Sequence, residues 1–402
     1  MRPLSGVKVV DFTIYVAAPA ATCVMGYLGA DIIKVETPKG DPYRVSGLGF
    51  GLPATADENP LYDTINAYKR GIALDMRTEK GKQIMRKMIE EADIFVTNYR
   101  EKALKGMGLT YEDVKAINPK IVYGKVDGYG EKGPDTARAG FDATAFFARS
   151  GFSNACAYHD SPPGLFPSGA GDTITSMALA IGLLAAYSQA AKTGEGSKVT
   201  TSLYSSGLWT MASPIVRQGF DQTRPYYFGN PGFLAISADY RCKDGTWVRF
   251  CGMQAEAYWP SFCRALGLEE YIEDERFTTS KRMKEHNALG YQMISEKVAL
   301  RTYDEWDPIF RANDLPYERV MTARQAAESE QAIVNDYVQK MDFPSRKNVY
   351  LPMPPFKISS MEDIKRERGP MVGEHTVEIL KQLNYSDEEI ADFLKDNAAK
   401  QA

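Results

Sequence analysis

The sequence predicts an α/β protein whose larger part is a mostly parallel sheet covered by helices. Short runs rich in β-branched residues alternate with helical segments over the first two hundred residues, as expected for strands joined by helical crossovers. After about Gly219 the pattern becomes mixed α+β. The length of 402 residues also exceeds what one hydrophobic core usually supports. We therefore expect two domains.

Five runs in the first half of the chain are the strand candidates. They cover residues 7–12, 31–36, 93–99, 121–126 and 198–204. Between the second and third of them, segment 79–92 places four apolar residues at helical spacing, namely Ile84, Met85, Met88 and Ile89. Strands separated by helices of this length favour a parallel sheet with helices on its faces.

The region from about 225 to 321 is expected to form a smaller α+β domain. The stretch "ADYRCKDGTWVRFCG" predicts a hairpin that turns at Asp244 and Gly245. Thr302 and Glu305 have the spacing of a capping box before a helix. Near the end of the chain, Ser386 and Glu389 repeat this spacing and introduce the second of two short helices.

Composition and charge exclude several classes of function. The net charge is −4 and no basic run resembles a nucleic-acid tract, so we expect no nucleic-acid partner. The N-terminus has no signal peptide and the longest apolar stretch, about 177–187, is too short to cross a bilayer. We therefore expect no membrane association and a cytoplasmic location. Five scattered cysteines and three histidines show no metal-ligand spacing, so no metal site is expected.

Common cofactor and nucleophile motifs are missing from the sequence. The first predicted strand is not followed by G-x-G-x-x-G, since the nearest glycines, Gly26 and Gly29, come at the far end of the next helix. There is no P-loop and no G-x-S-x-G elbow. Chemistry with NAD or ATP, and α/β-hydrolase chemistry, therefore lack their usual signals.

Six basic side chains follow or flank predicted strands: Lys69, Arg70, Arg77, Arg100, Lys102 and Lys105. A solvated surface is one interpretation of this cluster. The other is a site for phosphate anions, because open α/β sheets bind ligands at the ends of their strands. The residues alone leave both interpretations open.

The stretch "SGAGDTITSMALAIGLLAAY" places Asp172 between a glycine-rich turn and an apolar segment. Aspartate is a good N-cap, and the cap of a buried helix is the simpler interpretation. A helix N-terminus also keeps a carboxylate ionised, and an ionised carboxylate is a nucleophile towards an activated acyl group. Gly169 and Gly171 would let a substrate approach closely. Both interpretations remain open on these residues alone.

A series of stretches carries a resemblance to a known family. In chain order they are "LSGVKVVDFT", "AAPAAT", "LGADIIKVETPKGD", "NAYKRGIALDMRTEKGK", "ADIFVTNYR", "INPKIVYGKVDGYGEKGP", "GAGDTITSMALAIGLLAAY" and "GEHTVEILKQLNYS". They resemble the class III CoA-transferases, also called the formyl-CoA transferase or CaiB/BaiF family. "GYGEKGPD" followed by "AGFDATAFFARSG" is similar to the branch that acts on 2-hydroxy acids, such as the phenyllactate and 2-hydroxyisocaproate CoA-transferases.

The resemblance implies the architecture and the assembly. It implies a Rossmann-like large domain built from both chain ends, over residues 1–220 and 322–402, and a small domain over 225–321. It also implies a homodimer of two subunits interlocked as linked rings. The substrates would be an acyl-CoA or enoyl-CoA donor and a free carboxylic acid. The CoA thioester would be a substrate, with no tightly bound cofactor and no metal.

The resemblance also assigns roles to individual residues. Asp172 aligns with the nucleophilic aspartate, which passes through a mixed anhydride and an aspartyl-CoA thioester. The segments implied to bind CoA are Val16 and Ala17; Leu74, Asp75, Met76 and Arg77; and Asn98, Tyr99, Arg100 and Lys105. Thr37 and Gly106 stand where many members carry arginines, so Arg44 or Lys105 is expected to compensate. The segment "YYFGNPGF" replaces the glycine-rich loop that covers the intermediate in the formyl-CoA enzyme.

Two rival functions use the same fold or the same ligand. The related α-methylacyl-CoA racemases need an acid/base pair to move an α-proton, and they carry a histidine where this chain has Phe141. Phenylalanine exchanges no proton, so the sequence favours the transferase. A CoA-binding protein without catalysis is the second alternative. Tyr15, Phe141 and Asp142 are the candidate acyl pocket, and Phe146 and Phe147 are expected either to line it or to lie in the core.

Overall fold

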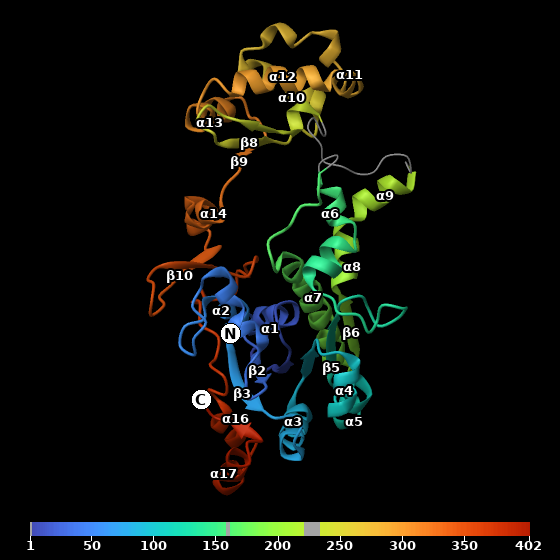
Figure 1. Ribbon diagram of the computed structural model, residues 1–402, viewed down its shortest axis with the longest axis vertical. Coiled ribbons are helices and arrows are strands. Elements are labelled where there is room, and N and C mark those ends of the chain that lie inside the picture. The colour runs from blue at the N-terminus through green and yellow to red at the C-terminus, as the bar shows by residue number, and fades with distance from the viewer. Residues whose placement is uncertain (1, 158–160, 221–233) are drawn as a thin grey trace. The chain divides into compact units, whose positions relative to one another are not determined.

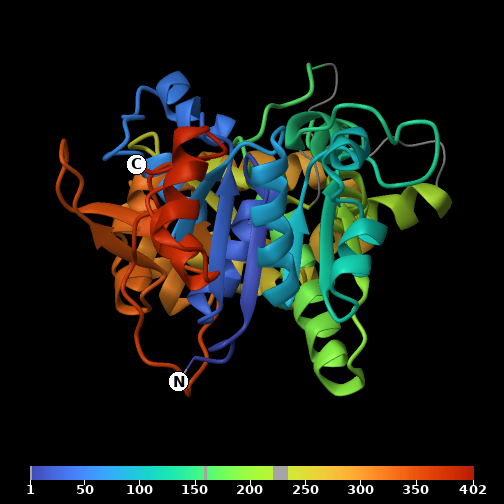
Figure 2. The same cartoon turned by 90° about the horizontal axis from the view of Figure 1, so that it is seen from below.

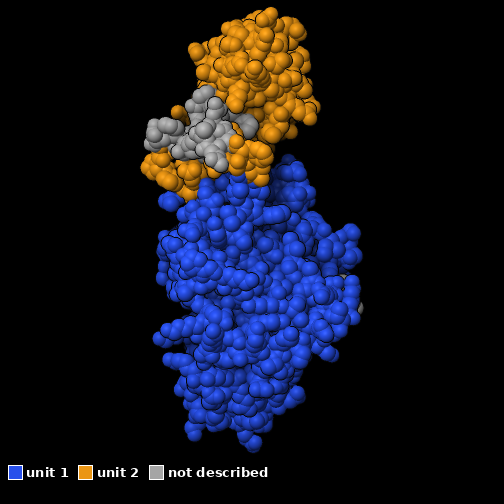
Figure 3. All heavy atoms as spheres, turned by 90° about the vertical axis from the view of Figure 1, so that its right-hand side faces the viewer, with its two compact units in different colours: residues 1–152, 165–215, 327–402 blue, residues 153–164, 216–326 orange. Residues whose placement is uncertain are grey.

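The computed structural model describes residues 2–157, 161–220 and 234–402. The chain divides into two compact units, coloured separately in Figure 3. The larger unit contains residues 1–152, 165–215 and 327–402, and the smaller contains 153–164 and 216–326. The segment "YYFGNPGF" at 226–233 lies outside the described residues.

A seven-stranded sheet forms the centre of the larger unit (Figure 1). Its strand order is β12-β3-β2-β1-β4-β5-β6, and every neighbouring pair is parallel except β12 with β3. The six parallel strands thus follow the order 3-2-1-4-5-6 of doubly wound nucleotide-binding sheets. Their bounds are β1 Lys8–Phe12, β2 Asp31–Glu36, β3 Lys69–Leu74, β4 Ile94–Thr97, β5 Val122–Asp127, β6 Lys198–Ser202 and β12 Ala399–Lys400.

The predicted parallel, helix-covered sheet is confirmed, and so are all five strand candidates. The strand β3 was missed because it opens on two cations. Lys69 is buried against Asp11, with 2.8 Å between Nζ and Oδ2, and the Arg70 guanidinium pairs with Asp31 on β2. The sequence of this segment alone is too polar to predict a strand. Asp11 and Asp31, which are distant in sequence, neutralise the two cations and so allow them to lie in β3.

Helices cover both faces of the sheet, and neighbouring strand residues point to opposite sides. Val9 belongs to the core on one face, with α1 (Ala17–Tyr27) and α7 (Ala170–Thr193). Val10 belongs to the core on the other face. There the covering helices include α3 (Glu79–Glu91) and α16 (Thr376–Gln382), which lie over the near face of the sheet in Figure 2. The predicted helix with Ile84, Met85, Met88 and Ile89 is α3, and all four side chains are buried.

The remaining elements complete the larger unit and the connections between the units. A 3₁₀ helix covers Pro42–Phe50 and a π-helix covers Asp142–Ala148. A hairpin pairs β10 (Val338–Met341) with β11 (Val349–Pro352). The other helices are α2 Pro60–Asn66, α4 Glu101–Met107, α5 Tyr111–Ile117, α6 Phe152–Ala155, α8 Leu203–Thr210, α9 Ala212–Phe220, α14 Ala323–Glu328, α15 Glu330–Val334 and α17 Asp387–Lys395.

The smaller unit has its own three-stranded antiparallel sheet and its own core. The strands β7 (Asp239–Arg241) and β8 (Trp247–Phe250) form the predicted hairpin, and Gly245 in the turn has φ +84°. The third strand is β9 (Tyr317–Arg319), which pairs with β8. Its main helices are α10 Ala255–Leu266, α11 Ser280–Glu285, α12 Asn287–Val298 and α13 Tyr303–Ala312. The capping boxes predicted for α13 and α17 are both present.

The helix α7 is longer than the sequence analysis expected. It has 24 residues, and within the described ranges it is the one helix long and apolar enough to cross a membrane by length and composition. The apolar stretch 177–187 is the middle of this helix, which begins at Ala170 and ends at Thr193. Leu179, Ala180 and Leu183 on α7 are buried in the core of the larger unit, so part of this helix serves the core.

Candidate active site

The predicted site lies where the strand order of the sheet reverses. The strands β1 and β4 are neighbours, but the chain continues from β1 towards β2 and from β4 towards β5. Open α/β sheets bind ligands outside the carboxyl ends of the strands at this point. The Asn98 side chain joins the two loops there, since its Oδ1 accepts the N–H of Ile14 at 2.9 Å and its Nδ2 donates to the Ile14 carbonyl at 2.6 Å. Asn98 therefore fixes the turn that leads into α1.

This turn leaves the start of α1 without a cap. Tyr15 has φ +63°, and its N–H donates to Asp41 Oδ1 at 3.1 Å. Val16 is the N-cap residue of α1, with no side-chain capping bond, and no acidic residue stands in the first turn. Uncapped amides at a helix start attract negative charge. Val16 and Ala17 are thus placed to offer backbone N–H groups to an anion.

Asp172 lies in the first turn of α7, and the prediction that it caps this helix is wrong. The helix begins at Ala170 with Gly169 as N-cap residue in a left-handed conformation, φ +86°. Asp142 holds this helix start instead, because its Oδ2 accepts the Gly169 N–H at 2.6 Å. A Cβ built on Gly169 would meet Val16 Cγ1 at 3.9 Å, so the starts of α7 and α1 lie side by side.

The glycine at 171 serves packing. A Cβ at this position would approach Phe146 Cγ to 2.6 Å, a distance that no relaxed side chain tolerates. Phe146 and Phe147 are both buried in the core beneath α7, which decides between the two roles expected for them. Gly171 therefore allows α7 to lie directly on Phe146, whereas the sequence analysis expected it to admit a substrate.

Burial and like charge set the electrostatics of Asp172. Burial, followed by the charge of Asp142, raises the pKa of Asp172 to about 7. Both effects oppose the helix N-terminus, which favours the ionised form. Tyr43 shares this environment, since burial and then the charges of Asp172, Asp41 and Asp142 raise its pKa to about 12. The phenol of Tyr43 therefore faces the carboxylates in its neutral form.

Two aromatic residues that adjoin Val16 and Asp142 in the chain contact each other. Tyr15 and Phe141 meet edge to face, with ring centroids 5.7 Å apart, and their exposed fractions are 37% and 55%. Phe141 directly precedes Asp142, and Tyr15 directly precedes Val16. The structure thus brings together Tyr15, Phe141 and Asp142, the three residues expected to line an acyl pocket.

The other predicted CoA residues differ in what they can offer. Leu74 and Met76 are buried, and Leu74 also pairs with Ala399 of β12, so neither side chain is open to a ligand. Tyr99 is stacked on Phe12 with ring centroids 4.4 Å apart. Asp75 holds the exposed Arg77 guanidinium through its two carboxylate oxygens. Arg100 and Lys105 lie exposed at the start and end of α4. Arg77 is thus neutralised by Asp75, and Arg100 and Lys105 remain as exposed cations in the segment that follows β4.

The basic cluster expected from the sequence does not form one group. Lys69 is buried at the amino end of β3, where it bonds to Asp11, and Arg70 next to it pairs with Asp31. Both lie at the wrong end of the strand for a ligand at the carboxyl edge. Arg44 is also committed, because it forms a two-point ion pair with Glu36 and stacks on Tyr62. The expectation that Arg44 replaces a missing phosphate ligand is therefore not supported. Lys105 remains as the other residue that was expected to compensate.

Comparison with known proteins decides the family. The profile of CoA-transferase family III matches residues 4–376. The chain belongs to CoA-transferase family III. It is 36% identical to (R)-2-hydroxy-4-methylpentanoate CoA-transferase of Clostridioides difficile over 97% of this chain and 98% of that protein. It is 39% identical to cinnamoyl-CoA:phenyllactate CoA-transferase of Clostridium sporogenes over 98% of this chain and 96% of that one.

A solved structure of a CaiB/BaiF family protein from Brucella suis matches the fold of this CoA-transferase. It superposes with a TM-score of 0.82 at 27% identity and covers 95% of this chain and 99% of its own. Members of family III are enzymes that use CoA thioesters as substrates. The resemblance noted in the sequence is thereby confirmed, and the fold of this CoA-transferase is α/β as expected.

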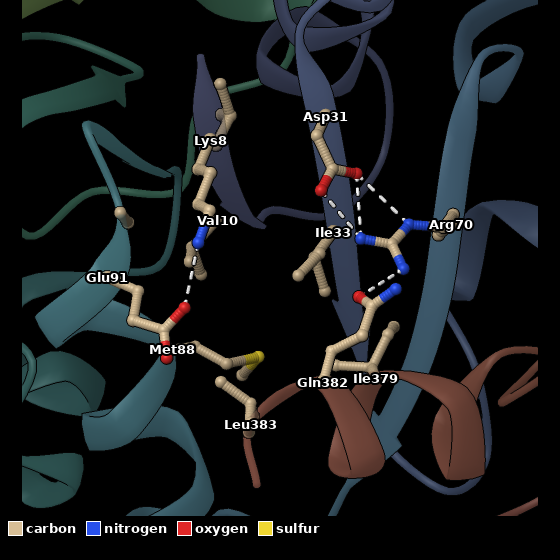
Figure 4. A pocket seen from close by; sticks show the side chains of 12 residues that line it. Lys8, Val10, Asp31, Ile33, Arg70, Met88, Glu91, Ile379, Gln382 and Leu383 are labelled. Carbon is tan, nitrogen blue, oxygen red and sulfur yellow. Dashed lines mark hydrogen bonds and ion pairs between the residues drawn. The ribbon is translucent and has the colours of Figure 1, made fainter. Parts of the chain in front are cut away.

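A cavity of about 320 Å³ lies beside the amino ends of β1, β2 and β3 (Figure 4). Val10 and Ile33 form its floor between α3 and α16. Its charged groups satisfy one another, since Lys8 pairs with Glu91, and Arg70 pairs with Asp31 and Glu378. This cavity contains none of the predicted site residues of the CoA-transferase.

Sequence reasoning missed two residues of the site in this CoA-transferase. Tyr43 and Asp41 come from the segment after β2, and no motif marks either of them as a neighbour of Asp172. The one available signal was the pair "GD" at Gly40 and Asp41 after the end of β2, which is typical of a loop whose aspartate accepts backbone hydrogen bonds. The proximity of Tyr43 to Asp172 depends on the folding of segments more than one hundred residues apart.

Proposed function

We propose that this enzyme transfers CoA from an acyl-CoA or enoyl-CoA donor to a free 2-hydroxy carboxylic acid, with Asp172 as the nucleophile. The observation that carries this proposal is the position of the Asp172 carboxylate at the start of α7, beside the uncapped start of α1. A nucleophile and a set of free backbone amides are the two parts that acyl transfer needs. Two relatives that are similar over almost their whole length act on 2-hydroxy acids according to their names.

The first half-reaction loads CoA onto the enzyme. An ionised Asp172 oxygen attacks the thioester carbonyl carbon, the C–S bond breaks and CoA leaves as a thiolate. The product on the enzyme is a mixed anhydride. The thiolate then attacks the Asp172 carbonyl carbon, which releases the donor acid as a carboxylate and leaves an aspartyl-CoA thioester. Each step exchanges one acyl bond for another, so no oxidant, reductant or metal is required.

The second half-reaction repeats these steps with the acceptor. The carboxylate of the acceptor acid attacks the Asp172 carbonyl carbon and expels the CoA thiolate. The thiolate then attacks the acceptor carbonyl carbon of the new anhydride. The acceptor leaves as its CoA thioester, and the Asp172 carboxylate is regenerated. Backbone N–H groups of Val16 and Ala17 stabilise the oxyanion that develops in each attack.

The surroundings of Asp172 suit this sequence of reactions. A carboxylate with a pKa of about 7 is a stronger base than an ordinary aspartate and is still substantially ionised at neutral pH. Its partial burial limits the access of water to the activated acyl groups. Arg100 and Lys105, in the segment that follows β4, supply positive charge for the CoA phosphates.

The aromatic pair favours an apolar acid as the acceptor. Tyr15 and Phe141 present exposed ring edges next to the Asp142–Gly169 contact. Rings in this position suit a branched or aromatic side chain at C3 of a 2-hydroxy acid. Phe141 also lacks a proton to exchange, which argues against the racemase reaction.

We further propose that the enzyme is a homodimer. On the larger unit, Ile181 of α7 and Trp209 of α8 have exposed fractions of 69% and 83%. Large apolar side chains exposed on adjoining helices are typical of protein interfaces. A second copy of the chain is the partner that the family resemblance implies.

Intact-protein mass spectrometry with and without hydroxylamine tests the mechanism. Incubation with cinnamoyl-CoA or another acyl-CoA, without acceptor, is expected to add to wild type the mass of CoA less one water, as a thioester does, and hydroxylamine is expected to release the CoA. The Asp172→Ala variant is expected to form no adduct. The matched control is Asp135→Asn, which removes a carboxylate paired with Arg149 elsewhere in the unit.

Two results contradict the proposal. The first is transfer of CoA to a labelled acid by the Asp172→Ala variant at the wild-type rate. The second is exchange of an α-deuterium of the acyl-CoA with solvent in the absence of any transfer, which would identify a racemase. A wild-type protein that binds CoA and does neither reaction would identify a CoA-binding protein.

A further inference from the structure

A buried ion pair lies directly behind the turn that carries Tyr15. Lys34 on β2 and Asp41 after it are both fully buried, and 3.0 Å separates Lys34 Nζ from Asp41 Oδ2. The ammonium also donates to the Thr13 carbonyl at 2.6 Å. Burial lowers the pKa of Lys34, but Asp41 and then Asp11 and Glu36 raise it above its ordinary value. Lys34 is therefore charged and fully partnered.

The second oxygen of Asp41 holds two tyrosines at once. Asp41 Oδ1 accepts the N–H of Tyr15 at 3.1 Å and the N–H of Tyr43 at 2.9 Å. Asp41 thus uses both of its oxygens, one for the cation and one for the two amides. The backbone N–H of Asp41 donates to Glu36 Oε1 at 2.7 Å, and this bond helps to fix the position of Asp41.

Tyr15 needs such support because of its backbone. A φ of +63° is uncommon for a residue with a side chain and is found where the surrounding structure imposes it. The bond from the Tyr15 N–H to Asp41 and the two bonds from Asn98 to Ile14 impose it here. In this conformation the Tyr15 ring lies against the Phe141 ring.

The second tyrosine, Tyr43, lies within electrostatic range of the Asp172 carboxylate. Tyr43 is half-buried, and the charges of Asp172 and Asp142 both act on its phenol. Phe141 is joined to Asp142 in sequence, and Asp142 bonds to the N–H of Gly169 at the start of α7. The Tyr15 and Phe141 rings are thus in contact with each other, and Tyr43 lies within electrostatic range of the carboxylate that carries the acyl group in the proposed function.

We propose that Lys34 and Asp41 are positioning residues that hold an aromatic wall of Tyr15, Tyr43 and Phe141, and that this wall selects acids with a large apolar side chain over small acids. The inference rests on the proposed function, because it names what determines the acid specificity of the same site. Neither Lys34 nor Asp41 touches the substrate. Their effect passes through the backbone of the two tyrosines.

The test measures a ratio that loss of folded protein does not change. For each variant, kcat/KM is determined for 3-phenyllactate and for lactate with one CoA donor, and the two values are divided. Asparagine offers one acceptor oxygen where Asp41 uses two, so Asp41→Asn breaks either the contact with Lys34 or the bonds to the tyrosines. We expect the ratio to fall about tenfold, since apolar pockets discriminate side chains by this order.

The matched control is another buried carboxylate that accepts a backbone N–H. Asp63 on α2 accepts the Gly369 N–H at 2.7 Å and is also buried in the larger unit. Asp63→Asn is expected to keep the wild-type ratio, whatever it does to stability. An equal fall of the ratio in Asp41→Asn and Asp63→Asn would show a general structural effect and would overturn the inference.

Two variants at side chains that are not fully buried cover the case in which Asp41→Asn does not fold. Tyr15→Asn removes the ring and keeps a residue that tolerates positive φ, and Tyr43→Ala removes the second ring. Both are expected to lower the ratio about tenfold, and Asp41→Asn is expected to add little once both rings are removed, in the triple variant. Ratios within twofold of wild type in Tyr15→Asn and Tyr43→Ala would overturn the inference.

Failure of the proposed function gives a different result. In that case the wild-type enzyme forms no CoA adduct on Asp172 and transfers no CoA to either acid. A wild-type enzyme that forms the adduct and transfers CoA, but whose ratio the variants leave unchanged, would refute the positioning role alone.

Discussion

Asp142 accepts the backbone N–H of Gly169 at 2.6 Å, and the charge of Asp142 raises the pKa of Asp172, which follows Gly169 by three residues. One side chain therefore does two things. It fixes the start of the helix that carries the proposed nucleophile, and it makes that nucleophile more basic. Because Asp142 also accepts the Ala143 N–H at 2.7 Å, both of its oxygens are occupied. The first prediction follows from this arrangement.

The rate of the first half-reaction should rise with pH through the pKa of Asp172. Only the ionised carboxylate attacks the thioester, so kcat/KM for the CoA donor is expected to increase as pH passes about 7 and to level off above it. Asp142→Asn removes the like charge and should lower the apparent pKa by about one unit. The variant should also lower kcat. Asparagine has one acceptor oxygen, whereas Asp142 uses two, so the bond that fixes the start of α7 or the bond to Ala143 is lost. A pH–rate profile of adduct formation measures both, and an unchanged apparent pKa in Asp142→Asn would contradict the coupling.

Replacing the nucleophile should stabilise the protein at high pH. The pKa of Asp172 is raised from 3.8 to about 7 on folding, so the folded state holds this proton more tightly than the unfolded state. The corresponding stability is present below pH 4 and is lost as pH rises to about 7. Asparagine does not ionise, so the Asp172→Asn variant does not lose this stability. Its free energy of unfolding at pH 8 should exceed that of wild type by an amount on the order of 2 kcal/mol. Urea unfolding at pH 4 and pH 8 checks this, and equal differences at both pH values would be evidence against a buried, ionisable Asp172.

The CoA phosphates should depend on the cations at the carboxyl edge. Arg100→Gln and Lys105→Gln are each expected to raise KM for the CoA thioester about threefold to tenfold, with little change in kcat, because each removes one charge contact. The effect should shrink at high salt. Lys115→Gln on α5 is the matched control for loss of one exposed cation. Steady-state kinetics at two salt concentrations measure the effect, and equal changes in all three variants would indicate a general effect of net charge.

Two glycines should respond in opposite ways to alanine. Gly171→Ala places a Cβ 2.6 Å from Phe146 Cγ, so the free energy of unfolding should fall by about 1–3 kcal/mol from overpacking. Gly106 lies on α4 with no atom within 4 Å of its Cβ position. Gly106→Ala should therefore stabilise the protein by about 0.5–1 kcal/mol through helix propensity. Thermal and urea unfolding measure both, and a neutral Gly171→Ala would show that α7 can move away from Phe146.

Much of the fold was predictable because its signals are local. The β-branched runs of β1, β2, β4, β5 and β6 are interrupted by helices with clear spacing, and the capping boxes at Thr302 and Ser386 were read directly. The strand β3 was missed because Lys69 and Arg70 look exposed until Asp11 and Asp31 neutralise them. Propensity and pattern carry no information about a partner 58 residues away.

The candidate site was predictable only in part, for the same reason. The resemblance to family III singled out Asp172, and the chemistry of the turn made that choice reasonable. The assignment of Asp172 as a cap was wrong because Gly169 and Asp142 share that task. Tyr43 and the Lys34–Asp41 pair were not found, since their contribution exists only after the loops behind β1 and β2 have packed together.

A charged side chain introduced among the exposed apolar residues of α7 and α8 should dissociate the proposed homodimer. Trp209 on α8 is 83% exposed, and an interface that covers it would bury a large aromatic surface, the kind of residue on which binding energy concentrates. Trp209→Glu should therefore convert a dimer into monomers at micromolar concentration, and light scattering after size-exclusion chromatography reads the mass directly. The matched control is Trp247→Glu, which changes a partly exposed tryptophan on β8 of the smaller unit. A wild-type mass of 44.7 kDa would contradict the dimer, since that is the mass of one chain. A dimer that survives Trp209→Glu would place the interface on another face.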